Sequence, residues 1–103
     1  MVVFSPDGSQ VAGYRDYAVR VWETETGRTL FDLSLDNEVN TLAFQPHGRF
    51  LVTASRGGLA EIWSTTNGVR RSVIRTVPFF TSVDETARAT FTPLGDRVML
   101  WNR

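Results

Sequence analysis

Short apolar runs separated by turn residues recur along the chain, and no segment shows helical periodicity over a useful length. Some runs are continuously apolar, as in a strand buried on both faces, and others alternate polar and apolar side chains. The runs lie at 2–4, 10–14, 18–22, 41–44, 50–55 and 59–63. The pattern therefore predicts an all-β chain of short antiparallel strands.

A turn motif, Phe-x-Pro-x-Gly, separates these runs and occurs three times. It begins at Phe4 (FSPDG), Phe44 (FQPHG) and Phe91 (FTPLG), at steps of 40 and 47 residues. Proline fixes φ, and the following glycine tolerates positive φ, so each motif is typical of a hairpin turn. Three matches in register indicate an internal repeat.

A second anchor follows each of the first two turns. Trp22 lies five residues before Gly27, Trp63 lies five residues before Gly68, and the two tryptophans are 41 residues apart. A period of about 40 residues matches four-stranded propeller blades and is too long for leucine-rich or helical-hairpin repeats. With these motifs the chain resembles WD-repeat β-propellers, whose unit runs from an FSPDG turn to a VRVWD strand and a TG turn.

The resemblance implies an incomplete β-propeller made of blades of four antiparallel strands. The expected units are a blade at 1–38, a blade at 39–86 with a long loop at 77–86, and a truncated blade at 87–103, with Trp101 in its second strand. Closed propellers need at least four blades. We therefore expect a segment of a longer propeller, and an isolated chain that self-associates through an uncovered blade face.

The resemblance also has gaps, which bear on stability. The family often buries a hydrogen-bond network of Asp, His, Ser or Thr, and Trp. Asp16 matches the Asp position in the first unit, Gly57 replaces it in the second, and no Gly-His pair occurs. Stability should therefore rest on blade packing more than on buried polar contacts. The expected core positions are Phe4, Val11, Val19, Val21, Leu42, Phe44, Leu51, Ile62 and Phe91.

The composition limits the classes of partner that the chain is expected to bind. The formal net charge is zero, which argues against a nucleic-acid or anionic-membrane surface. No cysteine is present, so neither a disulfide framework nor a thiolate metal site is expected. No apolar run is long enough to span a membrane. A cytoplasmic location is the default expectation.

Catalytic and metal-binding patterns are missing from the sequence. The single histidine, His47, occupies a turn slot and has no partners for a triad or a zinc site. Asp36, Glu38, Asp84 and Glu85 form two acidic loops, which we interpret as solvated charges because the remaining features of an EF-hand are absent. We expect no enzymatic activity, no cofactor and no metal. An arginine group at 70–75 fits either carboxylate or phosphate recognition or, as we favour, a solvated outer strand.

One rim of the propeller is the expected binding surface, because in this family that rim commonly receives partners. Because of the loop at 77–86, Phe91 lies 23 residues after the turn glycine Gly68. In the preceding unit, Phe44 lies 17 residues after Gly27. The loop carries two adjacent aromatics, which fit either a binding hot spot or a pair of rings tucked against the blade edge. The expected protein-binding residues are Phe79, Phe80, Asn37, Tyr17 and Arg56.

Two functional classes follow from the resemblance. The first is a non-catalytic protein–protein interaction scaffold that binds a protein or peptide on the rim. The alternative is a regulatory or sensor propeller module of a larger multidomain enzyme. A hydrolytic propeller enzyme is disfavoured, because the lone histidine sits in a turn slot that varies among Asp, His and Leu.

Overall fold

The computed structural model is built from strands and turns. It describes residues 2–46, 49–56, 59–75, 87–91 and 98–102, and no helix occurs among them. The strands are β1 (Val2–Phe4), β2 (Gln10–Arg15), β3 (Ala18–Glu23), β4 (Thr29–Ser34), β5 (Val39–Phe44), β6 (Phe50–Ser55), β7 (Leu59–Ser64), β8 (Arg70–Arg75), β9 (Ala87–Phe91) and β10 (Val98–Asn102).

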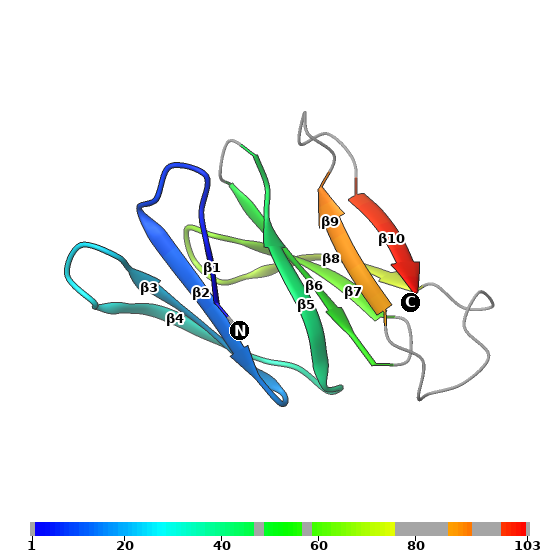
Figure 1. Ribbon diagram of the computed structural model, residues 1–103. Coiled ribbons are helices and arrows are strands. Elements are labelled where there is room, and N and C mark those ends of the chain that lie inside the picture. Colours follow the sequence, from blue (N-terminus) through cyan, green and yellow to red (C-terminus); the bar gives the residue numbers. More distant parts are fainter. Residues whose placement is uncertain (1, 47–48, 57–58, 76–86, 92–97, 103) are drawn as a thin grey trace.

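These strands form three antiparallel sheets that follow chain order. Strands β1–β4 form blade 1, β5–β8 form blade 2, and β9 pairs with β10. The sheets stand side by side, with blade 2 between blade 1 and the β9–β10 pair (Figure 1). The predicted all-β architecture of four-stranded blades is confirmed.

The two tryptophans occupy equivalent positions, as predicted. Trp22 pairs across the sheet with Val11, and Trp63 pairs with Leu51. Each also marks a register shift toward the outer strand, between Val21 and Trp22 in blade 1 and between Ile62 and Trp63 in blade 2. Because a bulge increases local twist, both blades twist at the same point of their third strand.

The fixed Trp-to-Gly spacing has a backbone cause. Gly27 and Gly68 have φ of 76° and 73°, a conformation that side chains rarely adopt. Their N–H groups donate to the carbonyls of Glu23 and Ser64 at 2.8 and 2.9 Å. Each glycine therefore closes the turn that returns the chain to the outer strand.

Apolar side chains from the two blades meet in one buried cluster, and a smaller cluster joins blade 2 to β9. The larger cluster contains Ala12, Val19, Val21, Leu33, Leu35, Val39, Leu42, Phe44, Leu51 and Trp63. The smaller one contains Val52, Ala54, Ala60 and Phe91. Phe31 adds a contact between blades, because a Cβ at Gly68 would lie 2.9 Å from its ring. Packing between sheets therefore supplies the core.

Most expected core positions are buried. Confirmed positions are Val19, Val21, Leu42, Phe44, Leu51 and Phe91. Val11 and Ile62 are only partly buried, and the prediction for Phe4 is wrong, because its side chain is 64% exposed. Phe4 lies on the face of blade 1 that points away from blade 2, and no described strand packs there. We call this surface the open face.

The buried polar contacts differ between the blades. Trp63 Nε1 donates to Thr53 Oγ1 at 3.1 Å, and both side chains are buried. The residue of blade 1 equivalent to Thr53 is Gly13, which has no side-chain hydroxyl to accept from Trp22. Asp16 contributes its main-chain carbonyl, which accepts from Val39 N at 2.7 Å.

Candidate protein-binding rim

Three chain segments from two blades meet at one end of the sheets. They are the β2–β3 turn, the linker at 35–38 between β4 and β5, and Arg56, which follows β6. Leu35 N donates to Tyr17 O, and Arg56 N donates to Glu38 O, each at 2.8 Å. The linker is thus hydrogen-bonded to the turn before it and to the turn after it.

Apolar anchors hold the two ends of the linker. Leu35 and Val39 are 7% and 4% exposed and belong to the core between the blades. Asp16, whose carbonyl receives the Val39 N–H, has a φ of 55°, which is uncommon for a residue other than glycine. Because both ends are fixed, the exposed middle of the linker has a defined position.

The rim presents polar and aromatic side chains to solvent. Tyr17 is 55% exposed, and Asn37 is also exposed. Arg56 Nη1 lies 3.4 Å from Glu38 Oε1, and both side chains are about half exposed. Three predicted binding residues, Tyr17, Asn37 and Arg56, therefore come from loops that meet, although their role in binding stays a prediction. Phe79 and Phe80 lie outside the described residues.

Within the described ranges, no group of three or more His, Cys, Asp or Glu side chains could hold a metal ion. His47 and Gly57 lie outside those ranges. No helix in the described part of the chain is long and apolar enough to cross a membrane.

Two buried polar groups near the rim were not anticipated from the sequence. Asn40 lies at a register shift in β5, beside the pair formed by Val39 and Ser55. Asn40 Nδ2 and Ser55 Oγ have no hydrogen-bond partner among the described residues, while Asn40 O accepts from Tyr14 Oη at 2.6 Å. The register shift was the missing information, since no local pattern in the sequence marks it.

One arginine of the β8 group, Arg70, has a structural partner. Arg70 Nη1 lies 3.0 Å from Glu61 Oε2, and the Glu61 side chain is 5% exposed. The guanidinium therefore neutralises a carboxylate buried in blade 2. This contact supports the interpretation of β8 as an ordinary outer strand.

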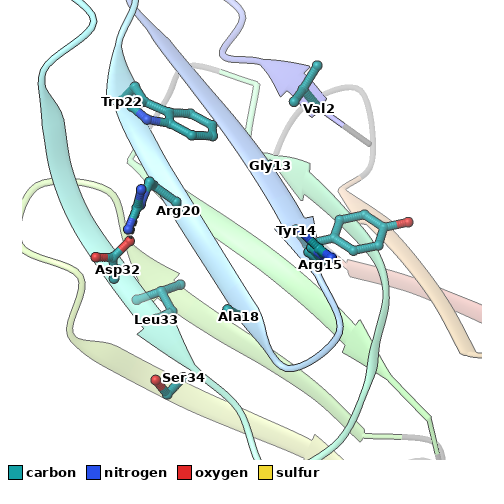
Figure 2. A pocket seen from close by; sticks show the side chains of 10 residues that line it. All are labelled: Val2, Gly13, Tyr14, Arg15, Ala18, Arg20, Trp22, Asp32, Leu33 and Ser34. Atoms are coloured by element: carbon teal, nitrogen blue, oxygen red, sulfur yellow. Dashed lines mark hydrogen bonds and ion pairs between the residues drawn. The ribbon is translucent and has the colours of Figure 1, made fainter.

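The open face of blade 1 contains a groove (Figure 2). This groove of about 540 Å³ runs along Val2, Gly13, Ala18 and Trp22. Gly13 allows Val2 and Trp22 to pack closely on the backbone of β2, because a Cβ there would lie 3.0 Å from Val2 Cγ1 and 3.3 Å from the Trp22 ring. At the same face, Arg20 Nε donates to Asp32 Oδ1 at 2.7 Å, and this contact raises the pKa of Arg20.

Comparison with known protein families supports the repeat. The model described as "WD domain, G-beta repeat" (WD40) matches residues 1–23 and 28–64. These segments cover more than half of the chain and contain Trp22, Trp63 and the first two Phe-x-Pro-x-Gly turns.

Several curated proteins are similar over about half of the chain. A Lissencephaly-1 homolog of Caenorhabditis briggsae is 36% identical over 58 residues, which are 52% of this chain and 15% of that protein. The small ribosomal subunit protein RACK1 of Candida albicans is 34% identical over 59 residues, 56% of this chain and 19% of that protein. A coronin-like protein of Saccharomyces cerevisiae is 31% identical over 49 residues, 48% of this chain and 8% of that protein. The matched regions are thus less than a fifth of each relative.

Solved structures agree on the fold. The β-propeller domain of Cps50 (Swd1) from Myceliophteria thermophila superposes with a TM-score of 0.76 at 23% identity, covering 96% of this chain and 32% of that one. The structure of U3-55K gives a TM-score of 0.66 at 22% identity, covering 72% and 25%. At this identity the likeness concerns the fold alone.

Proposed function

The chain belongs to the WD40-repeat family, and from this premise we propose that it is a non-catalytic protein-interaction segment whose contact surface is the rim around the linker at 35–38. WD40 proteins typically act as protein-interaction scaffolds. The proposed partner is a protein or peptide that contacts Tyr17, Asn37 and Arg56.

One observation carries the proposal. Main-chain hydrogen bonds from Leu35 to Tyr17 and from Arg56 to Glu38 hold three loops from two blades in one surface. A loop that a rigid scaffold positions can bind without a large ordering cost, because its backbone is already fixed. Exposed Tyr and Arg side chains are the residue types that most often dominate binding energy at interfaces.

The charges on this rim also suit a protein surface. The Arg56–Glu38 pair leaves both side chains about half exposed, and Asp36 adds a carboxylate on the same linker. A mixed margin around Tyr17 fits the polar edge of a protein interface better than a uniformly basic nucleic-acid site.

Site-specific photocrosslinking tests this surface. A photoreactive phenylalanine analogue at position 37 should form a discrete adduct with a partner protein in cells, identified by mass spectrometry. Thr26 is the matched control, because the β3–β4 turn lies at the opposite end of blade 1, beside the β1–β2 turn to which Thr24 Oγ1 donates.

The adduct must depend on the rim side chains. The variants Tyr17→Ala and Arg56→Ala should each reduce the adduct about tenfold, corresponding to about 1.4 kcal/mol of binding energy. Their melting temperatures should stay close to that of the parent, since both side chains are largely solvent-exposed. Equal adducts at positions 37 and 26, or adducts insensitive to both variants, would remove the rim from consideration.

A further inference from the structure

The turn between β7 and β8 contains the one asparagine of the sequence that precedes a glycine. Asn67 is exposed, and Gly68 follows it with a φ of 73°. An asparagine in this position can react with its own main chain, because glycine has no side chain to keep its nitrogen away from the preceding amide. The other asparagines, Asn37, Asn40 and Asn102, precede larger residues. This turn therefore carries a reactive pair that the rest of the sequence lacks.

The reaction is an intramolecular displacement on the asparagine side chain. The main-chain nitrogen of Gly68 attacks Asn67 Cγ, the bond from Cγ to Nδ2 breaks, and Nδ2 leaves as ammonia with the proton that Gly68 N loses. The product is a succinimide ring. Water then opens the ring at either carbonyl, which gives aspartate or isoaspartate at position 67. Each product adds one negative charge, and isoaspartate also adds one methylene to the main chain.

The folded turn engages both reacting groups. Gly68 N donates to Ser64 O at 2.9 Å, and Asn67 Oδ1 accepts from Val69 N at 3.0 Å. The first bond holds the proton on the attacking nitrogen, and the second fixes the side-chain amide in place. Both bonds must be released before Gly68 N can reach Asn67 Cγ. The reaction should therefore proceed from a turn that has opened locally.

Blade 1 holds this turn closed. The Phe31 ring on β4 lies so near Gly68 that a Cβ there would be 2.9 Å from it. Phe31 is partly buried and packs against the core between the blades. Opening the turn separates Gly68 from this ring, so the contact between the blades opposes opening. The turn lies at the end of the sheets opposite the rim around Asn37.

We propose that Asn67 is a site of spontaneous deamidation whose rate is set by the contact between Gly68 and Phe31. The modification is irreversible. With the extra methylene of isoaspartate, Gly68 N no longer meets Ser64 O, and the contact with Phe31 is lost. Chains in which the blades have parted at this end are thus marked permanently. The proposal is independent of the rim function.

Blade 1 also provides a matched residue without the reactive amide. Thr26 occupies the slot of Asn67, before Gly27. Its Oγ1 accepts from Arg28 N at 3.2 Å, as Asn67 Oδ1 accepts from Val69 N. The variant Asn67→Thr should therefore keep the turn, and it cannot deamidate.

Ageing of the full chain of 103 residues at neutral pH tests the proposal. Ion-exchange chromatography separates the more acidic product, and peptide mass spectrometry locates the change. The parent should gain one negative charge at position 67, and Asn67→Thr should gain none there. The folded parent should react about tenfold or more slowly than the same chain unfolded in urea, because the opened turn is a minor state. Equal rates in the folded and unfolded parent, or no product at Asn67 in the unfolded chain, would overturn the proposal.

Two variants separate this turn from the rest of the contact between the blades. Phe31→Ala removes the ring beside Gly68 and should accelerate the reaction about threefold or more, because the turn opens more often. Tyr14→Phe removes the 2.6 Å bond from Tyr14 Oη to Asn40 O at the rim end and should leave the rate unchanged. An unchanged rate in Phe31→Ala, or equal acceleration by both variants, would contradict control by the Phe31 contact.

Hydrogen exchange of the Gly68 amide covers the case in which Phe31→Ala fails to fold. NMR measures this exchange in the parent chain. Relative to the unfolded chain, exchange and deamidation should be slowed by the same factor, within about threefold, because both require release of the bond to Ser64 O. A protected Gly68 amide combined with deamidation at the rate of the unfolded chain would overturn the proposal.

Discussion

Blade 1 and blade 2 are built from the same repeat yet differ in what surrounds them. Phe4 and Phe44 begin the same turn motif, and Trp22 and Trp63 lie at the same point of the third strand. Phe44 is 8% exposed and Phe4 is 64% exposed. Burial in this fold is therefore decided by the neighbouring sheet, since the residue and its local motif are the same in both cases.

The blades also differ in how they hold their tryptophan. Blade 2 pairs Trp63 Nε1 with the Thr53 hydroxyl in its interior, whereas blade 1 has Gly13 at the equivalent position. The hydrogen bond occurs in the covered blade, whereas in the open blade the Trp22 ring packs closely on Gly13. A buried N–H needs an acceptor, while one that water can reach does not.

The largest predicted difference between the blades concerns the two phenylalanines. Phe44→Ala should lower the free energy of unfolding by about 3 to 5 kcal/mol, because a fully buried aromatic ring leaves a cavity. Phe4→Ala should lower it by less than about 1 kcal/mol, because its ring is already mostly in water.

Urea unfolding followed by circular dichroism measures both changes. The comparison should be made at a concentration where the chain is monomeric, so that association through the open face does not contribute. Equal losses for the two variants would mean that another element covers Phe4, and the contrast between the blades would then be wrong.

A smaller effect is expected at the tryptophan contact of blade 2. Thr53→Val keeps the shape of the side chain but removes the acceptor of Trp63 Nε1, which leaves a buried N–H unpaired. The expected loss is about 1 to 3 kcal/mol, and Thr53→Ser, which keeps the hydroxyl, should recover most of the hydrogen-bond part. Chemical denaturation of the three chains tests this, and a Val variant as stable as the parent would show that the bond contributes nothing.

The smallest effect concerns the first turn of each blade. Asp7 Oδ1 accepts from Ser9 N, Ser9 Oγ and Ser5 Oγ at 2.8 to 2.9 Å, and these bonds lower the pKa of Asp7 from 3.8 to about 2. The slot holds His47 in blade 2, flanked by Gln45 and Arg49 in place of the serines. Of these two turns, the turn of blade 1 should therefore be the one whose contribution to folding stability changes at acid pH.

The sign of this response follows from the lowered pKa. The Asp7 contacts contribute stability above pH 3.8, and this contribution is lost as the pH falls through about 2. In the Asp7→Asn variant, the denaturation midpoint should fall less steeply between pH 3.8 and about 2. An NMR titration of the Asp7 carboxyl gives the pKa directly, and an ordinary value near 3.8 would contradict the hydrogen-bonded turn.

Much of the fold could be predicted because its signals are local. The Pro-x-Gly turn, the glycine five residues after each tryptophan and the strand alternation each depend on a few neighbouring residues. The exposure of Phe4 could not be predicted from them, because it depends on whether a sheet packs on one face. The partial burial of Val11, which pairs with Phe4, has the same non-local cause, whereas Ile62 packs against the smaller cluster that includes Phe91.

The candidate site was predictable in part. Family resemblance placed Tyr17, Asn37 and Arg56 on one rim, and the structure brings their loops together. The contacts that fix those loops are main-chain hydrogen bonds, which cannot be inferred from the side-chain types in the sequence. The Arg56–Glu38 pair spans 18 residues along the chain, so only a three-dimensional arrangement reveals it.

The linker at 35–38, which is hydrogen-bonded to both blades, also defines which segment could be transplanted as a unit. Residues 35–38 donate to the turn of blade 1 and accept from the turn of blade 2, so the linker belongs structurally to both. Grafting strands β5–β8 alone into another propeller would leave the Arg56 amide without its acceptor at Glu38 and the Val39 amide without its acceptor at Asp16. The natural cassette for recombination therefore begins at Leu35 and requires a recipient whose preceding turn offers carbonyls in the positions of Asp16 and Tyr17.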